Sequence, residues 1–195
     1  IASWLCPVSD RQVAALNTLS SRKQLYVLIP NLNMGGAERV VVTLLRHIDR
    51  SKFDCCLVVL GDGEGAMATI LPPDLRVIAL NRTRVSFSVP ALVDLLWRSQ
   101  PELVFSNLSH LNLILAMTRF LMPRTIKFIA RESSVVSINM KQYRAQSLWR
   151  FLYNFFYHRL DMVICQTAIM QNDIVTNFSV PIEKTVIIQN PVDVE

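Results

Sequence analysis

Seven short apolar runs, rich in valine, isoleucine, leucine or phenylalanine, recur along this chain of 195 residues. Short runs of this kind are typical of strands that are buried on both faces of a sheet. The predicted strands lie at residues 25–29, 55–60, 76–80, 103–105, 126–130, 162–165 and 186–188.

Segments with helical spacing lie between most of these runs. The first, at residues 40–48, places apolar side chains at positions i, i+1, i+4, i+5 and i+8, which share one helix face. Further helices are expected at residues 90–98, 110–121, 141–159 and 168–177, with Pro90 in a first turn and Thr167 as an N-cap. Strands that alternate with helices predict an α/β fold, a doubly wound, mainly parallel, Rossmann-like sheet of about seven strands with helices on both faces.

The composition fits one large core. Hydrophobic residues make up 51% of the chain and charged residues 18%, a balance that excludes disorder. Residues 1–21 fit the alternation poorly and are interpreted as a leading extension, so the domain is expected at residues 22–195. The sequence stops just after the last predicted strand, and we interpret this as a truncation before a further domain.

Charge and cysteine content exclude several classes of protein. The net charge of +5 is spread out, without the clustered basic stripe that binds nucleic acid, and it leaves an anionic small molecule or membrane surface as a partner. Cys55, Cys56 and Cys165 lie in predicted strands, and no spacing indicates a disulfide framework or a metal site. No stretch resembles a membrane span or a signal peptide, so a cytoplasmic protein is expected.

The sharpest local motif lies between the first strand and the first helix. Residues 30–39 are Pro-Asn-Leu-Asn-Met-Gly-Gly-Ala-Glu-Arg, at the place where doubly wound folds bind ligands. Gly35 and Gly36 either let the backbone approach a phosphate at a helix start or only make the turn. Glu38 either belongs to a ligand site or stabilises the first helical turn. Neither the P-loop pattern nor the dinucleotide glycine spacing is present, so no cofactor is predicted and an oxidoreductase is disfavoured.

Four later segments continue this motif in a recognisable order. With residues 33–39, they are 102–110 (Glu-Leu-Val-Phe-Ser-Asn-Leu-Ser-His), 129–132 (Ile-Ala-Arg-Glu), 160–167 and 184–193. Together they resemble the amino-terminal, acceptor-side domain of retaining glycosyltransferases of family 4, which have the two-Rossmann-domain B fold. The resemblance covers nearly everything from Gln24 onward. It implies a nucleotide-sugar donor that is held mainly by a second domain, which this sequence does not contain.

The resemblance also implies roles for individual residues. Gly35 and Gly36 would lie near the donor diphosphate, in a cleft loop that Glu38 and Arg39 support. His110 and Glu132 follow the fourth and fifth strands, so they should face the cleft as candidate catalytic residues, although His110 is equally well explained as a helix-start residue bonded to the backbone. Further candidates for acceptor or cleft contacts are Asn33, Ser106, Asn107 and Arg131.

The helix expected at residues 141–159 has two neighbouring apolar stripes. Leu148, Leu152 and Phe155 make one stripe, which is expected to be core. The other stripe is either buried or, together with nearby arginines, in contact with an anionic membrane surface. That stripe and those arginines are Trp149, Tyr153, Tyr157, Arg144, Arg150 and Arg159.

The sequence therefore predicts part of an enzyme that moves a hexosyl or N-acetylhexosaminyl group from a nucleotide sugar to an acceptor hydroxyl with retention of configuration. The expected acceptor is a lipid-linked sugar or a cell-surface polysaccharide precursor, and the expected place is the cytoplasm or the inner face of the membrane. The fragment alone is expected to be inactive. The alternatives are a nucleotide-binding oxidoreductase or epimerase domain and a non-enzymatic, partner-binding α/β domain.

Overall fold

The computed structural model of the protein describes residues 22–82, 85–143 and 145–191. The predicted leading extension, residues 1–21, and Arg144 therefore lie outside the described residues. All seven predicted strands are confirmed, with small shifts at their ends. They are β1 (Lys23–Ile29), β2 (Phe53–Val59), β3 (Arg76–Ala79), β4 (Leu103–Ser106), β5 (Lys127–Arg131), β6 (Met162–Cys165) and β7 (Thr185–Ile187).

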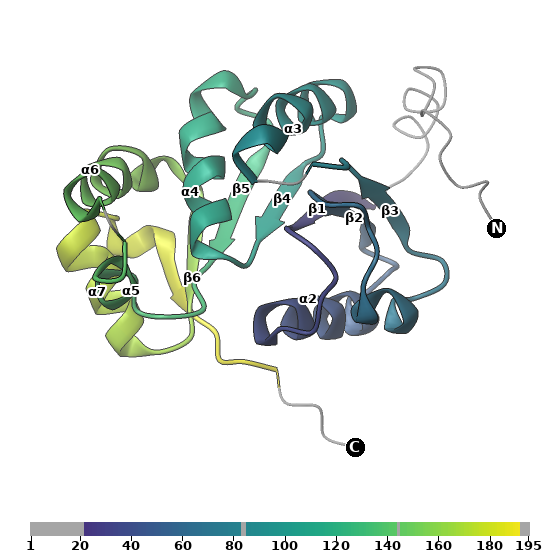
Figure 1. Cartoon of the computed structure of the whole chain (residues 1–195), viewed down its shortest axis with the longest axis horizontal. Coiled ribbons are helices and arrows are strands. Elements are labelled where there is room, and N and C mark those ends of the chain that lie inside the picture. Colours follow the sequence, from purple (N-terminus) through teal and green to yellow (C-terminus); the bar gives the residue numbers. More distant parts are fainter. Residues whose placement is uncertain (1–21, 83–84, 144, 192–195) are drawn as a thin grey trace.

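The strands form one parallel sheet in the order β3-β2-β1-β4-β5-β6-β7 (Figure 1). The chain leaves β1 toward β2 but leaves β4 toward β5, in the opposite direction along the sheet. The predicted Rossmann-like, doubly wound sheet is therefore confirmed, and its switch point lies between β1 and β4.

Helices cover both faces of the sheet and give the molecule two apolar cores. Helix α2 (Gly36–His47) and the short helix η1 (Ala66–Ile70) pack on one face. Helices on the other face are α3 (Val85–Ser99), α4 (Ser109–Thr118), α5 (Val136–Met140), α6 (Gln146–Phe156) and α7 (Ala168–Phe178). Adjacent Cys55 and Cys56 lie in different cores, because successive strand residues point to opposite faces.

Some helix boundaries differ from the prediction. Pro90 lies inside α3 rather than in its first turn, because the helix begins at Val85. Helix α5 was missed, and α6 begins at Gln146, five residues later than predicted. The predicted cap of α7 is confirmed, since the Thr167 hydroxyl oxygen accepts a hydrogen bond from the backbone N–H of Met170 at 3.3 Å.

Candidate functional site

A cavity of about 940 Å³ lies at the carboxyl edge of the sheet. Its walls come from the segments that follow β1, β2, β3 and β4, so it spans the switch point between β1 and β4. In doubly wound folds, ligands bind in the crevice at this position. The cavity is therefore the candidate functional site.

The loop after β1 brings Asn33 and Glu38 to this cavity. The Asn31 side-chain oxygen accepts a hydrogen bond from the backbone N–H of Asn33 at 3.0 Å, which shapes the turn. Gly35 is the N-cap of α2, and a Cβ on it would lie 2.2 Å from a carboxylate oxygen of Glu38. The absence of a side chain at Gly35 thus lets the Glu38 carboxylate fold back toward the helix start.

Gly36 is exposed, and no atom lies within 4 Å of the place where its Cβ would be. No side chain caps the amino end of α2, so the first N–H groups of this helix have no side-chain acceptor. The fold would therefore accept another residue in place of Gly36. A side chain there would only fill the open space beside the helix start. Gly36 and the exposed Arg39 are not part of the cavity wall.

His110 lies in the first turn of α4, half-buried, and lines the same cavity. Burial lowers the pKa of its imidazole, while the negative charge of Glu38 opposes that shift. The lowered pKa favours the neutral ring at pH 7, a form that can both donate and accept a hydrogen bond. Of the predicted site residues, the structure brings Asn33, Glu38 and His110 together in this cavity.

Sequence reasoning missed the polar cavity residues that follow β2 and β3. The missed residues are Asp62, Glu64, Asn81 and Arg82. Each comes shortly after a predicted strand, so the rule that pointed to Asn33 and His110 could have found them as well. The loop after β2 packs against the loop after β1. The Met67 N–H donates a hydrogen bond to the Leu32 carbonyl at 2.9 Å, and Gly65, with a φ of 142°, allows the close approach.

The prediction that Glu132 faces the cleft is wrong, because its side chain is 0% exposed. Its carboxylate accepts hydrogen bonds from the Ser109 hydroxyl at 2.6 Å, the Asn112 amide at 2.8 Å and the Tyr157 hydroxyl. Burial raises the pKa of the Glu132 carboxyl, and these hydrogen bonds oppose the shift. Glu132 is therefore a structural acid between the sheet and its covering helices.

Ser106, Asn107 and Arg131 are also buried and do not line the cavity at the switch point, although Arg131 lines a second cavity of about 650 Å³ beside α2. Arg131 donates to the Asn107 side-chain oxygen at 2.6 Å, and the Asn107 amide donates to the Ala37 carbonyl at 2.8 Å. Arg131 also donates to Asn190, which follows β7. Asn107 and Arg131 thus hold the start of α2, whereas the Ser106 hydroxyl donates to the Asn112 side-chain oxygen in α4. None of the three residues lines the cavity at the switch point.

Helix α6 buries two residues of the stripe for which burial and membrane contact were the alternatives, and it exposes two of the three residues that were predicted as core. Tyr153 and Tyr157 are buried, and the hydroxyl of Tyr153 donates to the Ser109 carbonyl at 2.9 Å, so they cannot contact a membrane. Leu148 and Phe155, predicted as core, are 56% and 48% exposed. The tyrosines face inward because buried acceptors are available to their hydroxyls.

The remaining residues of the predicted membrane contact differ in exposure. Trp149 is half-buried and packs on the Tyr143 ring, with 4.9 Å between ring centroids. Arg150 is exposed and Arg159 is half-buried. No helix in the described part of the chain combines the length and apolar character that crossing a bilayer requires. Among the described residues, no group of three or more histidine, cysteine, aspartate or glutamate side chains is arranged to hold a metal ion.

A doubly wound sheet with a polar cavity at its switch point defines a ligand-binding domain of the Rossmann-like class. The sequence profile of glycosyltransferase family 4 matches residues 34–195, which is more than half of the chain. The chain therefore belongs to glycosyltransferase family 4, and the resemblance to its amino-terminal domain is confirmed. No curated protein sequence matches it.

Solved structures show the same fold at low sequence identity. Anabaena HepE in complex with UDP and glucose matches with a TM-score of 0.61 and 16% identity, covering 88% of this chain and 45% of that chain. The lipopolysaccharide outer core galactosyltransferase WaaB matches with a TM-score of 0.63 and 11% identity, covering 89% and 47%. The UDP-GlcNAc 2-epimerase of Neisseria meningitidis bound to UDP-GlcNAc matches with a TM-score of 0.56 and 15% identity, covering 86% of this chain and 47% of that chain. The chain thus spans less than half of the length of these structures.

Proposed function

We propose that the chain is the acceptor-side domain of an enzyme that transfers a hexosyl or N-acetylhexosaminyl group from a nucleotide sugar to an acceptor hydroxyl, with retention of configuration. Membership of family 4 supports a transfer reaction. The observation that carries the proposal is the cavity at the switch point, where Glu38 and His110 line one space. This is the place where a neutral imidazole can orient a hydroxyl group.

The donor would be held mainly by a second domain, with its diphosphate near the start of α2. The uncapped N–H groups of the first helical turn and the open space at Gly36 suit a phosphate, because both the helix dipole and the free donors favour negative charge. Solved structures of this fold contain UDP with glucose in HepE and UDP-GlcNAc in an epimerase, which supports a UDP-sugar as donor.

The acceptor end would be a neutral, hydroxyl-rich sugar. The cavity is lined by three carboxylates and by one guanidinium, that of Arg82, so negative charge predominates. The carboxylates are those of Glu38, Asp62 and Glu64, and the amides of Asn33 and Asn81 lie beside them. Carboxylates accept hydrogen bonds from hydroxyl groups and repel anionic groups, and amides can both donate and accept. A lipid-linked sugar or a cell-surface polysaccharide precursor at the cytoplasmic side of a membrane fits this chemistry.

Catalysis in this proposal rests on positioning and electrostatics. His110 orients the acceptor hydroxyl, and the start of α2 stabilises the charge that develops on the leaving diphosphate. The buried Asn107 fixes that helix start through its hydrogen bond to the Ala37 carbonyl. No side chain of the cavity is required as a nucleophile.

The test is a transfer assay on the longer enzyme that contains this domain. UDP-glucose and UDP-N-acetylglucosamine serve as donors, with p-nitrophenyl glycosides and a membrane lipid extract as acceptors. His110→Ala should lower kcat/KM by about 100-fold, the range that general acid–base and positioning groups supply. His47→Ala, at the exposed end of α2, is the matched control.

Two outcomes would contradict the proposal. Conversion of UDP-N-acetylglucosamine to its epimer without any acceptor would favour an epimerase, whose fold this chain shares. An unchanged kcat/KM for His110→Ala, with transfer intact, would remove His110 from the site and leave it as a helix-start residue.

A further inference from the structure

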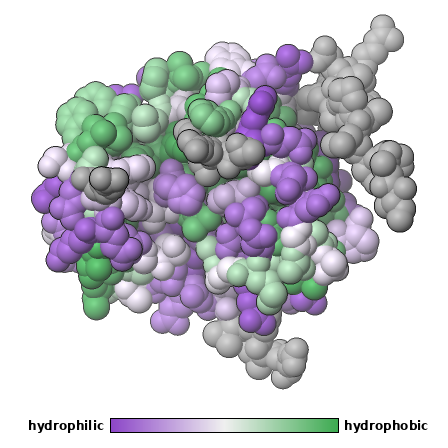
Figure 2. Space-filling model, in the orientation of Figure 1, coloured by the Kyte–Doolittle hydropathy of each residue, from purple (hydrophilic) through white to green (hydrophobic). Residues whose placement is uncertain are grey.

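The outer face of α6 carries an exposed apolar surface, here called the α6 patch, made of Leu148, Phe151 and Phe155 with Phe120 from η2 (Arg119–Leu121). The exposed fractions of the three phenylalanines are 60% for Phe151, 48% for Phe155 and 62% for Phe120. The α6 residues are spaced i, i+3 and i+7, so they lie on one side of the helix. Figure 2 shows hydrophobic side chains gathered over α6, at the upper left of the view.

Arg159 joins the aromatic rings of this patch. Its guanidinium lies 5.1 Å from the ring centroid of Phe155 and 6.0 Å from that of Phe120. The Phe151 and Phe155 rings stack with 5.8 Å between their centroids. Within the described part of the chain, Arg159 forms no salt bridge. A cation is thus held on an exposed apolar surface, and no carboxylate of the described residues forms a salt bridge with it.

The stretch of chain that carries the patch is rich in basic residues and poor in acidic ones. Between Glu102 and Asp161, the only acidic residue of the sequence is Glu132, and it is buried. The basic residues of the same stretch are Arg119, Arg124, Lys127, Arg131, Lys141, Arg144, Arg150 and Arg159. Of these, Arg124, Lys127, Lys141 and Arg150 are exposed, and Lys127 pairs with Asp161 at 3.2 Å. The face that carries the α6 patch therefore complements an anionic surface.

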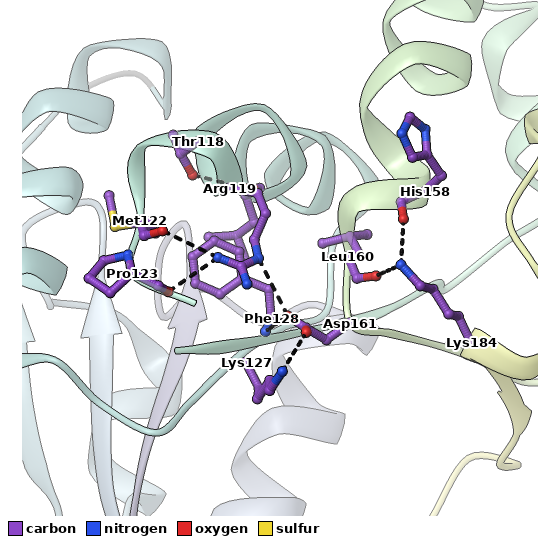
Figure 3. A network of polar contacts seen from close by, with 11 residues as sticks. Thr118, Arg119, Met122, Pro123, Lys127, Phe128, His158, Leu160, Asp161 and Lys184 are labelled. Atoms are coloured by element: carbon purple, nitrogen blue, oxygen red, sulfur yellow. Dashed lines mark hydrogen bonds and ion pairs between the residues drawn. The ribbon is translucent and has the colours of Figure 1, made fainter. Parts of the chain in front are cut away.

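A polar network fixes the segments beneath the patch (Figure 3). The Asp161 carboxylate accepts a hydrogen bond from the Phe128 N–H at 2.9 Å and lies 3.5 Å from Arg119 at the start of η2. Lys184 donates to the carbonyls of His158 at 2.7 Å and Leu160 at 3.1 Å, which fixes η3 (Tyr157–Arg159). Phe120 and Arg159 therefore project from anchored segments.

We infer that the α6 patch docks on an anionic lipid bilayer. The phenylalanine rings would enter the boundary between headgroups and acyl chains, while Arg150 and Arg159 would pair with lipid phosphates. A second copy of this chain is a poorer partner, because two such faces would bring like charges together. The inference rests on this surface and does not depend on the proposed reaction.

Co-sedimentation of the chain with vesicles tests the inference. Vesicles of phosphatidylcholine mixed equally with phosphatidylglycerol should bind the chain at low salt, release it at high salt and bind it better than pure phosphatidylcholine does. Phe151→Ser combined with Phe155→Ser should weaken binding about tenfold or more, because the apolar contact is lost. Arg150→Glu combined with Arg159→Glu should weaken binding to the anionic vesicles.

Matched controls lie on the opposite face of the sheet. Ile70→Ser in η1, where Ile70 is 46% exposed, and Arg46→Glu in α2 remove an exposed apolar group and a positive charge and should leave binding unchanged. Thermal unfolding checks that every variant is folded. The inference is overturned if the chain stays in the supernatant at low salt, or if the Phe151 and Phe155 variant binds as the unchanged chain does. If the unchanged chain binds no vesicles but forms a dimer, and the Phe151 and Phe155 variant is monomeric, then the patch contacts a second copy instead of a bilayer.

Discussion

At the scale of single residues, Glu132 shows that a position directly after a strand predicts where a side chain lies, but not whether it is exposed to a cleft. A side chain directly after a parallel strand reaches the carboxyl edge of the sheet, as Asn33 and His110 near their strands do. Whether it meets a cleft depends on residues that cover that edge. Ser109 from α4 and Tyr157 from η3 close over Glu132. No local spacing reveals this cover, because its residues come from distant parts of the chain.

The buried acid should make stability depend on pH. Burial raises the pKa of the Glu132 carboxyl, so the native state keeps a proton to higher pH than the unfolded chain, whose glutamates titrate near about 4.3. The free energy of unfolding contributed by this group should therefore fall as the pH rises from the unfolded to the folded pKa. Glu132→Gln should remove that fall. Urea unfolding of both proteins at a series of pH values measures it, and parallel curves would refute the assignment.

At Gly36, a substitution should affect activity without affecting stability. In the longer enzyme, Gly36→Val should lower kcat/KM about 100-fold, because a branched side chain would displace a phosphate from the helix start. The free energy of unfolding should change by less than about 0.5 kcal/mol, because the Cβ meets open space. Kinetics and urea unfolding of the same variant test both statements. Unchanged kinetics would mean that the glycine only makes the turn.

At the scale of elements, α6 marks a limit of pattern reading. The helix was predictable from its periodicity, but both of its stripes are apolar, so periodicity could not decide which one faces the core. The buried stripe is the one whose tyrosine hydroxyls reach acceptors, Ser109 for Tyr153 and Glu132 for Tyr157. Helix α5 has only five residues and is too short to show a period. The orientation of α6 and the formation of α5 both depend on contacts with other elements, which the local sequence does not reveal.

The loop from β2 to η1 depends on one glycine. Gly65 has a φ of 142° and a ψ of 168°, a region open to glycine only, and its Cβ would lie 2.4 Å from the Leu32 carbonyl oxygen. Gly65→Ala should therefore lower the free energy of unfolding by about 1–3 kcal/mol and displace Glu64 from the cavity. Urea unfolding measures the loss, with Gly36→Ala as the control whose Cβ meets no atom. Equal stability of the two variants would contradict the argument.

At the scale of the whole molecule, the class of fold was the most predictable property. The inner strands are largely buried and carry continuous apolar runs, and the edge strands β3 and β7, although less buried, keep short apolar runs, so all seven could be found along the sequence. Their order in the sheet could not be found in this way, because it depends on pairing between distant segments. The same holds for the cavity, which collects residues from the ends of four strands. The end of each strand was predictable from the sequence, but the cavity that residues after four of these ends form together was not.

The last prediction concerns the chain as one unit. It should fold by itself, with a single cooperative transition in urea, because one sheet carries a buried apolar core on each face. It should not turn over, because it spans less than half of the length of the solved structures that it matches, and the donor would be held mainly by the other half. The measurement is sugar transfer from UDP-glucose and UDP-N-acetylglucosamine by the chain, beside the longer enzyme at equal concentration. Steady multiple turnover by the chain alone would refute this division of labour between the two halves.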